Sequence, residues 1–192
     1  MNTFLKLCLL DTGEKISELQ KRLNGPGGYD FYKPLQRAVR LHSAGEHKKA
    51  LEVLEAPVNP TERKHNQDAF EKFRTRFGNV RTLYPVDEKG SLKFTSDGIE
   101  ILPDPLFEIT KGGIRQVYCL WPTQSPELTQ RYGAVACYIM RSTFKNHPIG
   151  NAGFYLADLI SGRIYSEKQI TNNTSLILSS DAASIGSIIK QI

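Results

Sequence analysis

The sequence has few cysteines and no apolar run that approaches the roughly 18 residues of a membrane span. Its three cysteines, Cys8, Cys119 and Cys137, form no Cys-x-x-Cys pair, and each lies in an apolar run. A thiol in such surroundings behaves as a small hydrophobic side chain, so we expect neither disulfides nor zinc. The apolar residues 4–10 include Lys6 and precede no small-residue cleavage site, so they do not match a signal peptide. We therefore expect a cytoplasmic protein with no membrane partner.

The common catalytic motifs are also absent. No Gly-x-Ser-x-Gly, Walker-type loop or dinucleotide fingerprint occurs. The four histidines, His42, His47, His65 and His147, lack metal-ligand spacing, although His42 and His47 flank the same helical turn. We therefore expect no cofactor and no bound metal.

The composition is that of a globular protein with an uneven charge. The chain has 192 residues, 40% of them hydrophobic and 23% charged, which fits one folded domain. The net charge is +5, and residues 1–81 carry 15 Lys plus Arg against 10 Asp plus Glu, whereas residues 82–192 carry 10 of each. The excess in the first part can attract phosphate backbones or acidic protein partners, but it is also common on a solubilising surface.

The first part of the chain has the periodicity of amphipathic helices. Pro34 suits the first turn of one helix, and Thr61 is a candidate cap for another. Phe70, Phe73 and Phe77 form one stripe of that last helix, which is typical of a core contact. The predicted helices cover residues 14–23, 34–43, 46–55 and 61–77.

Residues 38–57 resemble the inner half of a tetratricopeptide repeat. Ala38 and Ala50 are small enough for two helices to approach closely, and Gly45 permits the reversal between them. The resemblance implies a peptide-binding repeat, but only one copy is present, and such arrays need about three. The alternative is an antiparallel helical hairpin with no binding role.

The remaining chain predicts a sheet with two covering helices. Residues 114–121 are apolar on both alternating faces, which is typical of a central strand covered on both sides. We predict an α+β fold in which a basic helical region, residues 1–80, packs on a mainly antiparallel sheet in residues 81–192. The other predicted strands are residues 91–94, 99–102, 106–110, 153–159, 163–165 and 174–178, and the helices are 126–142 and 181–191.

From residue 61 onward these elements have the order αβββαβ, which is similar to the restriction-endonuclease-like nucleases. That family places an aspartate, often after proline, near one strand and a Glu-x-Lys on the next, so that two carboxylates bind a divalent metal. Pro103-Asp104 matches the first element, whereas the central strand carries Gln116-Val117-Tyr118 in place of the second. The resemblance makes Asp104 and Glu108 the catalytic candidates, and the departure argues for a scaffold.

Three functions remain open. The first is a non-catalytic binding protein whose partner is nucleic acid, a nucleic-acid-handling complex or an acidic protein. The second is a protein-interaction module that uses the hairpin at residues 34–55, and the third is a metal-dependent nuclease. The nucleic-acid contacts predicted for the first function are Arg37, Arg40, Lys48, Lys49, Arg63, Lys64, Arg74 and Arg76.

Overall fold

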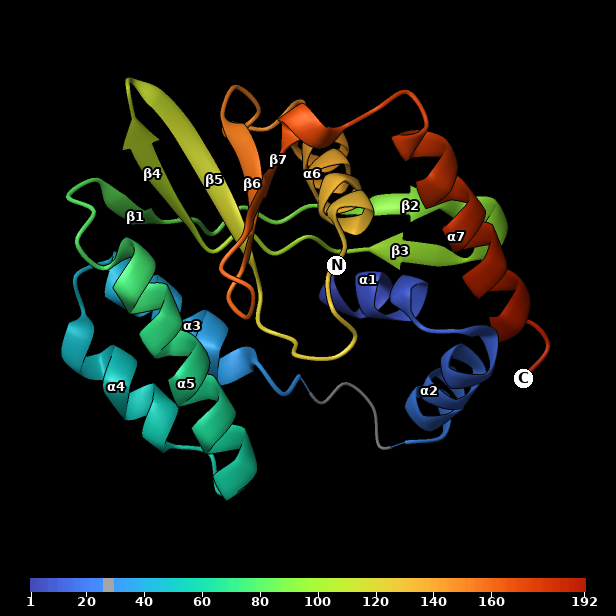
Figure 1. The fold of residues 1–192 in the computed structure, drawn as a ribbon, viewed down its shortest axis with the longest axis horizontal. Helices are drawn as coiled ribbons and strands as arrows, with labels where there is room; N and C mark the ends of the chain where they lie inside the picture. The colour runs from blue at the N-terminus through green and yellow to red at the C-terminus, as the bar shows by residue number, and fades with distance from the viewer. Residues whose placement is uncertain (26–29) are drawn as a thin grey trace.

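A five-stranded mixed sheet forms the centre of the protein (Figure 1). The computed structural model describes residues 1–25 and 30–192. The strand order is β1-β4-β5-β6-β7, in which only the β5–β6 pair is parallel. A separate two-stranded sheet pairs β2 with β3. The strands are β1 Leu83–Pro85, β2 Leu92–Phe94, β3 Ile99–Ile101, β4 Phe107–Lys111, β5 Ile114–Trp121, β6 Gly153–Asp158 and β7 Ile164–Ser166.

Helices cover both faces of this sheet, so the predicted α+β class is confirmed. They are α1 Asn2–Leu9, α2 Thr12–Asn24, α3 Lys33–Ser43, α4 His47–Glu55, α5 Pro60–Phe77, α6 Gln130–Phe144 and α7 Thr174–Ile189. Short 3₁₀ turns occur at Thr95–Asp97 and Glu167–Gln169. In the described part of the chain, no helix combines the length and apolar character that crossing a membrane requires.

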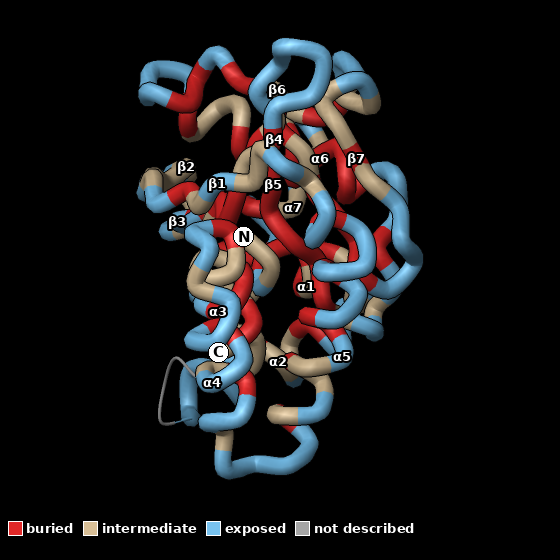
Figure 2. The backbone as a smooth tube through the Cα atoms, turned by 90° about the vertical axis from the view of Figure 1, so that its left-hand side faces the viewer, coloured by how far each residue is buried: buried red, intermediate tan, exposed pale blue. Residues whose placement is uncertain are grey.

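Strand β5 joins two hydrophobic clusters, one on each face of the sheet. Val117, Cys119 and Trp121 belong to the cluster that contains residues of α1, α2, α6 and α7. Tyr118 and Leu120 point to the other face and belong to the cluster of α3, α4 and α5. Figure 2 shows the buried chain running along β5 through the middle of the molecule. The prediction of a central strand covered on both sides is therefore confirmed.

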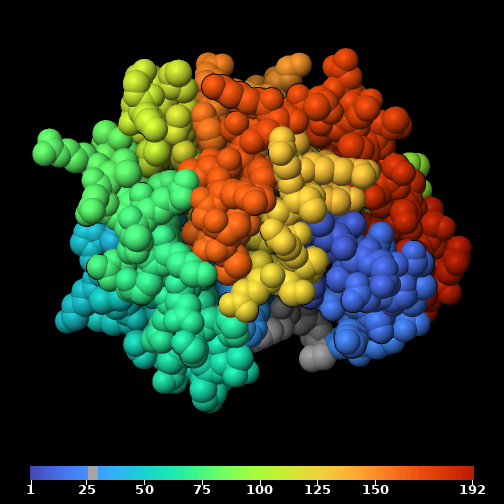
Figure 3. Space-filling view, in the orientation of Figure 1, coloured from blue at the N-terminus to red at the C-terminus, as the bar shows by residue number. Residues whose placement is uncertain are grey.

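The N-terminal helices are divided between these two faces. Phe4, Leu5 and Leu19 of α1 and α2 are buried with α6, whereas α3, α4 and α5 lie across the sheet from them. Figure 3 shows the first 25 residues on one side of the molecule and helices α4 and α5 on the other. The division at residue 80 stays a prediction, and the helices before it serve two separate clusters.

Helices α5 and α6 have N-terminal caps other than those predicted. Helix α5 is capped by Asn59, whose Oδ1 accepts from Thr61 N at 2.9 Å, so Thr61 itself is not the cap. Helix α6 begins at Gln130 rather than near Pro126, because Thr129 Oγ1 accepts from Tyr132 N at 3.4 Å. In both places the residue just before the observed helix satisfies the first free N–H groups.

Three other predictions need correction. Residues 80–90, for which no strand was predicted, contain β1, an edge strand whose Pro85 pairs with Phe107 of β4. The hairpin of β2 and β3 forms its own small sheet instead of joining the main one. Residues 174–178 start helix α7 rather than forming a strand, because Leu178, Ala182 and Ile185 are then buried on one helical face.

Candidate ligand-binding cleft

Most of the cations predicted to contact nucleic acid already have partners. Three lie in exposed ion pairs on their own helices, Lys49 with Glu46, Lys64 with Asp68 and Arg74 with Glu71. Two donate to backbone carbonyls, Arg63 to Pro57 O at 2.9 Å and Arg76 to Gly162 O at 2.6 Å. Arg37 and Lys48 are exposed. Intramolecular partners therefore satisfy much of the charge on which the sequence prediction rests.

Arg40, the remaining cation of this set, faces the sheet instead of solvent. Its Nη2 donates to Asp104 Oδ1 at 2.6 Å and to Pro105 O at 3.0 Å, and its Nε donates to Val86 O at 3.2 Å. Asp87 Oδ1 lies 3.3 Å from the same Nε. Arg40 therefore connects α3 to the segments before and after the β2–β3 hairpin.

The two catalytic candidates are each held by cations. Asp104 Oδ1 accepts from Arg40 and also from Lys89 Nζ at 2.9 Å. Glu108 on β4 receives three hydrogen bonds from Arg115, the shortest at 2.6 Å. Among residues 1–25 and 30–192, no group of three or more His, Cys, Asp or Glu side chains is placed to hold a metal ion.

Gln116 and Tyr118 of the central strand, which stand in place of a Glu-x-Lys, form a hydrogen bond with each other. Tyr118 Oη donates to Gln116 Oε1 at 2.8 Å, and the Tyr118 ring stacks on Tyr155 with a centroid distance of 5.0 Å. Desolvation raises the pKa of Tyr118 to about 12, so its hydroxyl stays protonated at neutral pH. These groups hold the strand together and offer no charge to a substrate.

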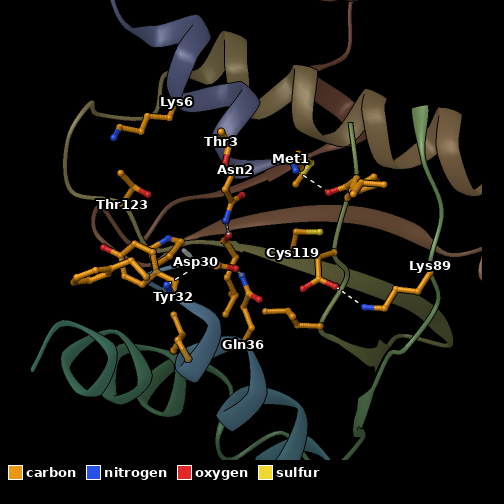
Figure 4. A pocket seen from close by; sticks show the side chains of 18 of the residues that line it. Met1, Asn2, Thr3, Lys6, Asp30, Tyr32, Gln36, Lys89, Cys119 and Thr123 are labelled. Carbon is orange, nitrogen blue, oxygen red and sulfur yellow. Dashed lines mark hydrogen bonds and ion pairs between the residues drawn. The ribbon is translucent and has the colours of Figure 1, made fainter. Parts of the chain in front are cut away.

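A large cleft opens where α1 and α3 meet the β3–β4 loop and the end of β5 (Figure 4). Its volume is about 1110 Å³, enough for a ligand larger than a typical metabolite. The cleft is lined by residues 1–3, 6, 22, 30–32, 35–36, 89–91, 102–104, 106, 119–120 and 122–123. These segments lie far apart in the sequence, so the cleft exists only in the folded protein.

Two aromatic side chains form part of the cleft wall, just before α3. Phe31 and Tyr32 are half-buried and contact each other edge to face, with a centroid distance of 5.1 Å. Asp30 fixes this stretch, because its carboxylate accepts from Tyr32 N and from Gln36 Nε2, both at 3.1 Å. Desolvation raises the pKa of Tyr32 above its ordinary value. The rings are thus held in place and still border open space.

Three cations also line the cleft, each beside a carboxylate. Lys6 Nζ lies 3.3 Å from Glu18 Oε1, Arg22 Nη2 lies 3.0 Å from the same oxygen, and Lys89 pairs with Asp104. Desolvation raises the pKa of Glu18, but Lys6 and Arg22 outweigh that effect and leave the pKa below its ordinary value. The side chain of Lys89 is 71% exposed, so it can turn toward a ligand.

Cys119, which lines the cleft, is not an activated nucleophile. Cys119 is buried, and desolvation raises the pKa of its thiol far above neutrality. A protonated thiol is a poor nucleophile. Asn2 lies nearby, and its Nδ2 donates to Leu120 O at 3.0 Å, which ties α1 to the end of β5. Cys119 and Asn2 therefore contribute to the shape of the cleft wall.

Of the described residues that line the cleft, the sequence predicts a functional role for Asp104 alone, as a catalytic candidate. Helix α3 begins at Lys33, one residue before the predicted Pro34, and Asp30 accepts from the backbone N of its N-cap residue Tyr32 without capping the helix. Nothing local, however, indicates that residue 6 and residue 89 face the same cleft. Comparison with known proteins adds no further guide, because no family model, curated protein or solved structure matches this chain.

Proposed function

We propose that this protein is a non-catalytic binding protein that holds a nucleotide unit, supplied by single-stranded nucleic acid or by a free nucleotide, in the cleft. The observation that carries the proposal is the pairing, in one cleft, of the aromatic side chains Phe31 and Tyr32 with the cations Lys6, Arg22 and Lys89. Aromatic rings stack on bases and cations contact phosphates.

Stacking supplies the larger part of the proposed affinity. Base stacking on an aromatic side chain contributes about 1–3 kcal/mol per base. The edge-to-face contact between Phe31 and Tyr32 limits the motion of both rings. Little conformational freedom is therefore lost when a base packs against them. A pyrimidine or purine is accepted alike, because every base has an apolar face.

Electrostatic attraction supplies the smaller part. Each of Lys6, Arg22 and Lys89 is already beside a carboxylate, so a phosphate gains only part of the attraction of a free cation. The acids Asp30 and Asp104 also line the cleft and repel an anion. We therefore expect moderate affinity and a limited salt dependence, with no need for a continuous basic face.

Fluorescence anisotropy of a short dye-labelled oligo(U) at low salt tests the proposal. Tyr32→Leu keeps an apolar side chain but removes the ring, and it should weaken binding about tenfold, the equivalent of about 1.4 kcal/mol. A double variant, Lys6→Gln with Lys89→Gln, should also weaken binding. The matched control, Lys48→Gln with Lys72→Gln, removes the same charge from exposed sites outside the cleft and should bind as the unmodified protein does.

The two sources of the nucleotide are separated by competition. Unlabelled mononucleotide that displaces oligo(U) as well as unlabelled oligo(U) does, per nucleotide, indicates a free nucleotide as the ligand. Displacement by the oligomer alone indicates a single strand that contacts the protein over several units. Binding that the control variant loses and the cleft variants retain would contradict the proposal.

A further inference from the structure

The turn between α3 and α4 brings two histidines together. His42 lies in the last turn of α3 and His47 is the first residue of α4. Gly45 reverses the chain between them with a φ of 82°, a conformation that suits glycine. The two Nδ1 atoms lie 3.0 Å apart, and both side chains line a hollow of about 390 Å³ beside residues 78, 80 and 83–85.

We propose that His42 and His47 form a two-histidine site for a divalent transition metal ion, with Ni²⁺ or Cu²⁺ preferred. Metal–nitrogen bonds of about 2.05 Å to two atoms 3.0 Å apart enclose an angle of about 94°. That angle is close to the right angle of octahedral and square-planar ions and below the tetrahedral angle that Zn²⁺ prefers. Water in the hollow completes the coordination.

The surroundings hold one ligand firmly and leave the other accessible. The His42 ring contacts Phe70 and Phe73 edge on, with centroid distances of 5.6 and 5.8 Å, so its orientation is fixed. His47 is exposed and can adjust to an incoming ion.

Without metal, the same two nitrogens share one proton as a hydrogen bond. Metal binding at both Nδ1 atoms moves that proton to Nε2 of the same ring, so a metal ion and the hydrogen bond compete for the pair. Arg74 opposes the site because its positive charge repels the ion, although Glu71 lies 3.0 Å from its guanidinium and offsets part of that charge. The affinity is therefore that of two imidazoles with water, weaker than that of a closed structural site.

Titration of the full chain with NiCl₂, followed by calorimetry, tests the site. We expect one equivalent of Ni²⁺ to bind to the unmodified protein. His47→Gln should weaken that binding by at least about tenfold. Even the loss of a residue that only supports a metal ligand typically costs about that much in affinity. His65→Gln with His147→Gln removes two histidines elsewhere, and this control should retain the unmodified affinity.

Thermal unfolding gives an independent reading. NiCl₂ should raise the midpoint of the unmodified protein and of the His65 and His147 control, but not that of His47→Gln, because only a native-state site stabilises the fold. Since His47 is exposed, its replacement should leave the midpoint without metal unchanged, and His42→Asn provides a second test of the pair. Equal Ni²⁺ binding by His47→Gln and the unmodified protein, loss of binding in the control, or no binding at all would overturn the proposal.

Discussion

Arg40 of α3 and Asp104 of the β3–β4 loop form an ion pair, in which Arg40 Nη2 donates to Asp104 Oδ1 at 2.6 Å. Sequence patterns assign these two residues to different functions, one to nucleic-acid contact and the other to metal-dependent catalysis. In the folded chain the carboxylate and the guanidinium form one partly buried pair, in which the Arg40 side chain is only 20% exposed. This relationship turns two candidate functional residues into a structural link beside the cleft.

Replacing Arg40 by alanine should destabilise the protein by about 2–3 kcal/mol, because it leaves Asp104 and two backbone carbonyls without their guanidinium donor. Urea denaturation followed by circular dichroism measures this loss. Lys64→Ala is the control, since its pair with Asp68 is exposed and contributes at most about 0.5 kcal/mol. Equal free energies of unfolding for the two variants would show that the Arg40 contacts do not stabilise the fold.

Replacing Gly133 by alanine should destabilise the packing of α6 on β7 by about 1–3 kcal/mol. A Cβ at this position would lie 2.2 Å from Cγ of Tyr165, a buried ring whose hydroxyl donates to Leu128 O at 3.1 Å and so cannot swing aside. Thermal unfolding measures the effect. Gly13→Ala serves as the control, because its nearest contact is 3.5 Å away, and it should be neutral or slightly stabilising.

The His42 and His47 pair should make stability depend on pH. Desolvation lowers the pKa of His42 in the folded state below about 6.5, its unfolded value, so the unfolded chain binds more protons. The free energy of unfolding is therefore greatest above pH 6.5 and falls as the pH drops from there through the folded pKa. Urea denaturation between pH 7.5 and 5 measures the slope.

In that experiment His42→Gln should give a shallower slope than the unmodified protein. His147→Gln removes a histidine outside the pair and should keep the original slope. If both variants show the same pH dependence as the unmodified protein, the desolvation of His42 has no bearing on folding.

Local patterns were sufficient to predict the parts of the fold that depend on neighbouring residues. The alternation from Val117 to Trp121 identifies β5 because each face is buried by a separate cluster. Asp11 and Glu14 form the capping box of α2, a contact between residues three apart. Spacing could also have indicated the Lys64 and Asp68 pair, since residues four apart on a helix are neighbours.

Non-local pairing explains what local patterns missed. Strand β1 has three residues and contains Pro85, so it resembles a loop until β4 is placed beside it. The segment 174–178 is short and ends in three apolar residues, a pattern that fits a strand or a helix equally well. Helix α7 forms because burial of Ile185 and its neighbours against α6 decides between them.

The cleft depends even more on the tertiary structure. Lys6, Tyr32 and Lys89 come from three separate segments, and no spacing along the chain relates them. The eight predicted cations, in contrast, were close in sequence and suggested a surface. Nearby carboxylates such as Glu46 and Glu71 instead pair with three of them. Charge counted along a sequence omits this internal pairing.

The salt dependence of single-strand binding tests the central claim most directly. For single strands, log K falls with log salt by about 0.7 for each phosphate contact. Binding through the three cations of the cleft therefore predicts a slope of about −2 for oligo(U). A slope of about −6, which the eight cations of the helical region would give, or no binding at low salt, would contradict the account.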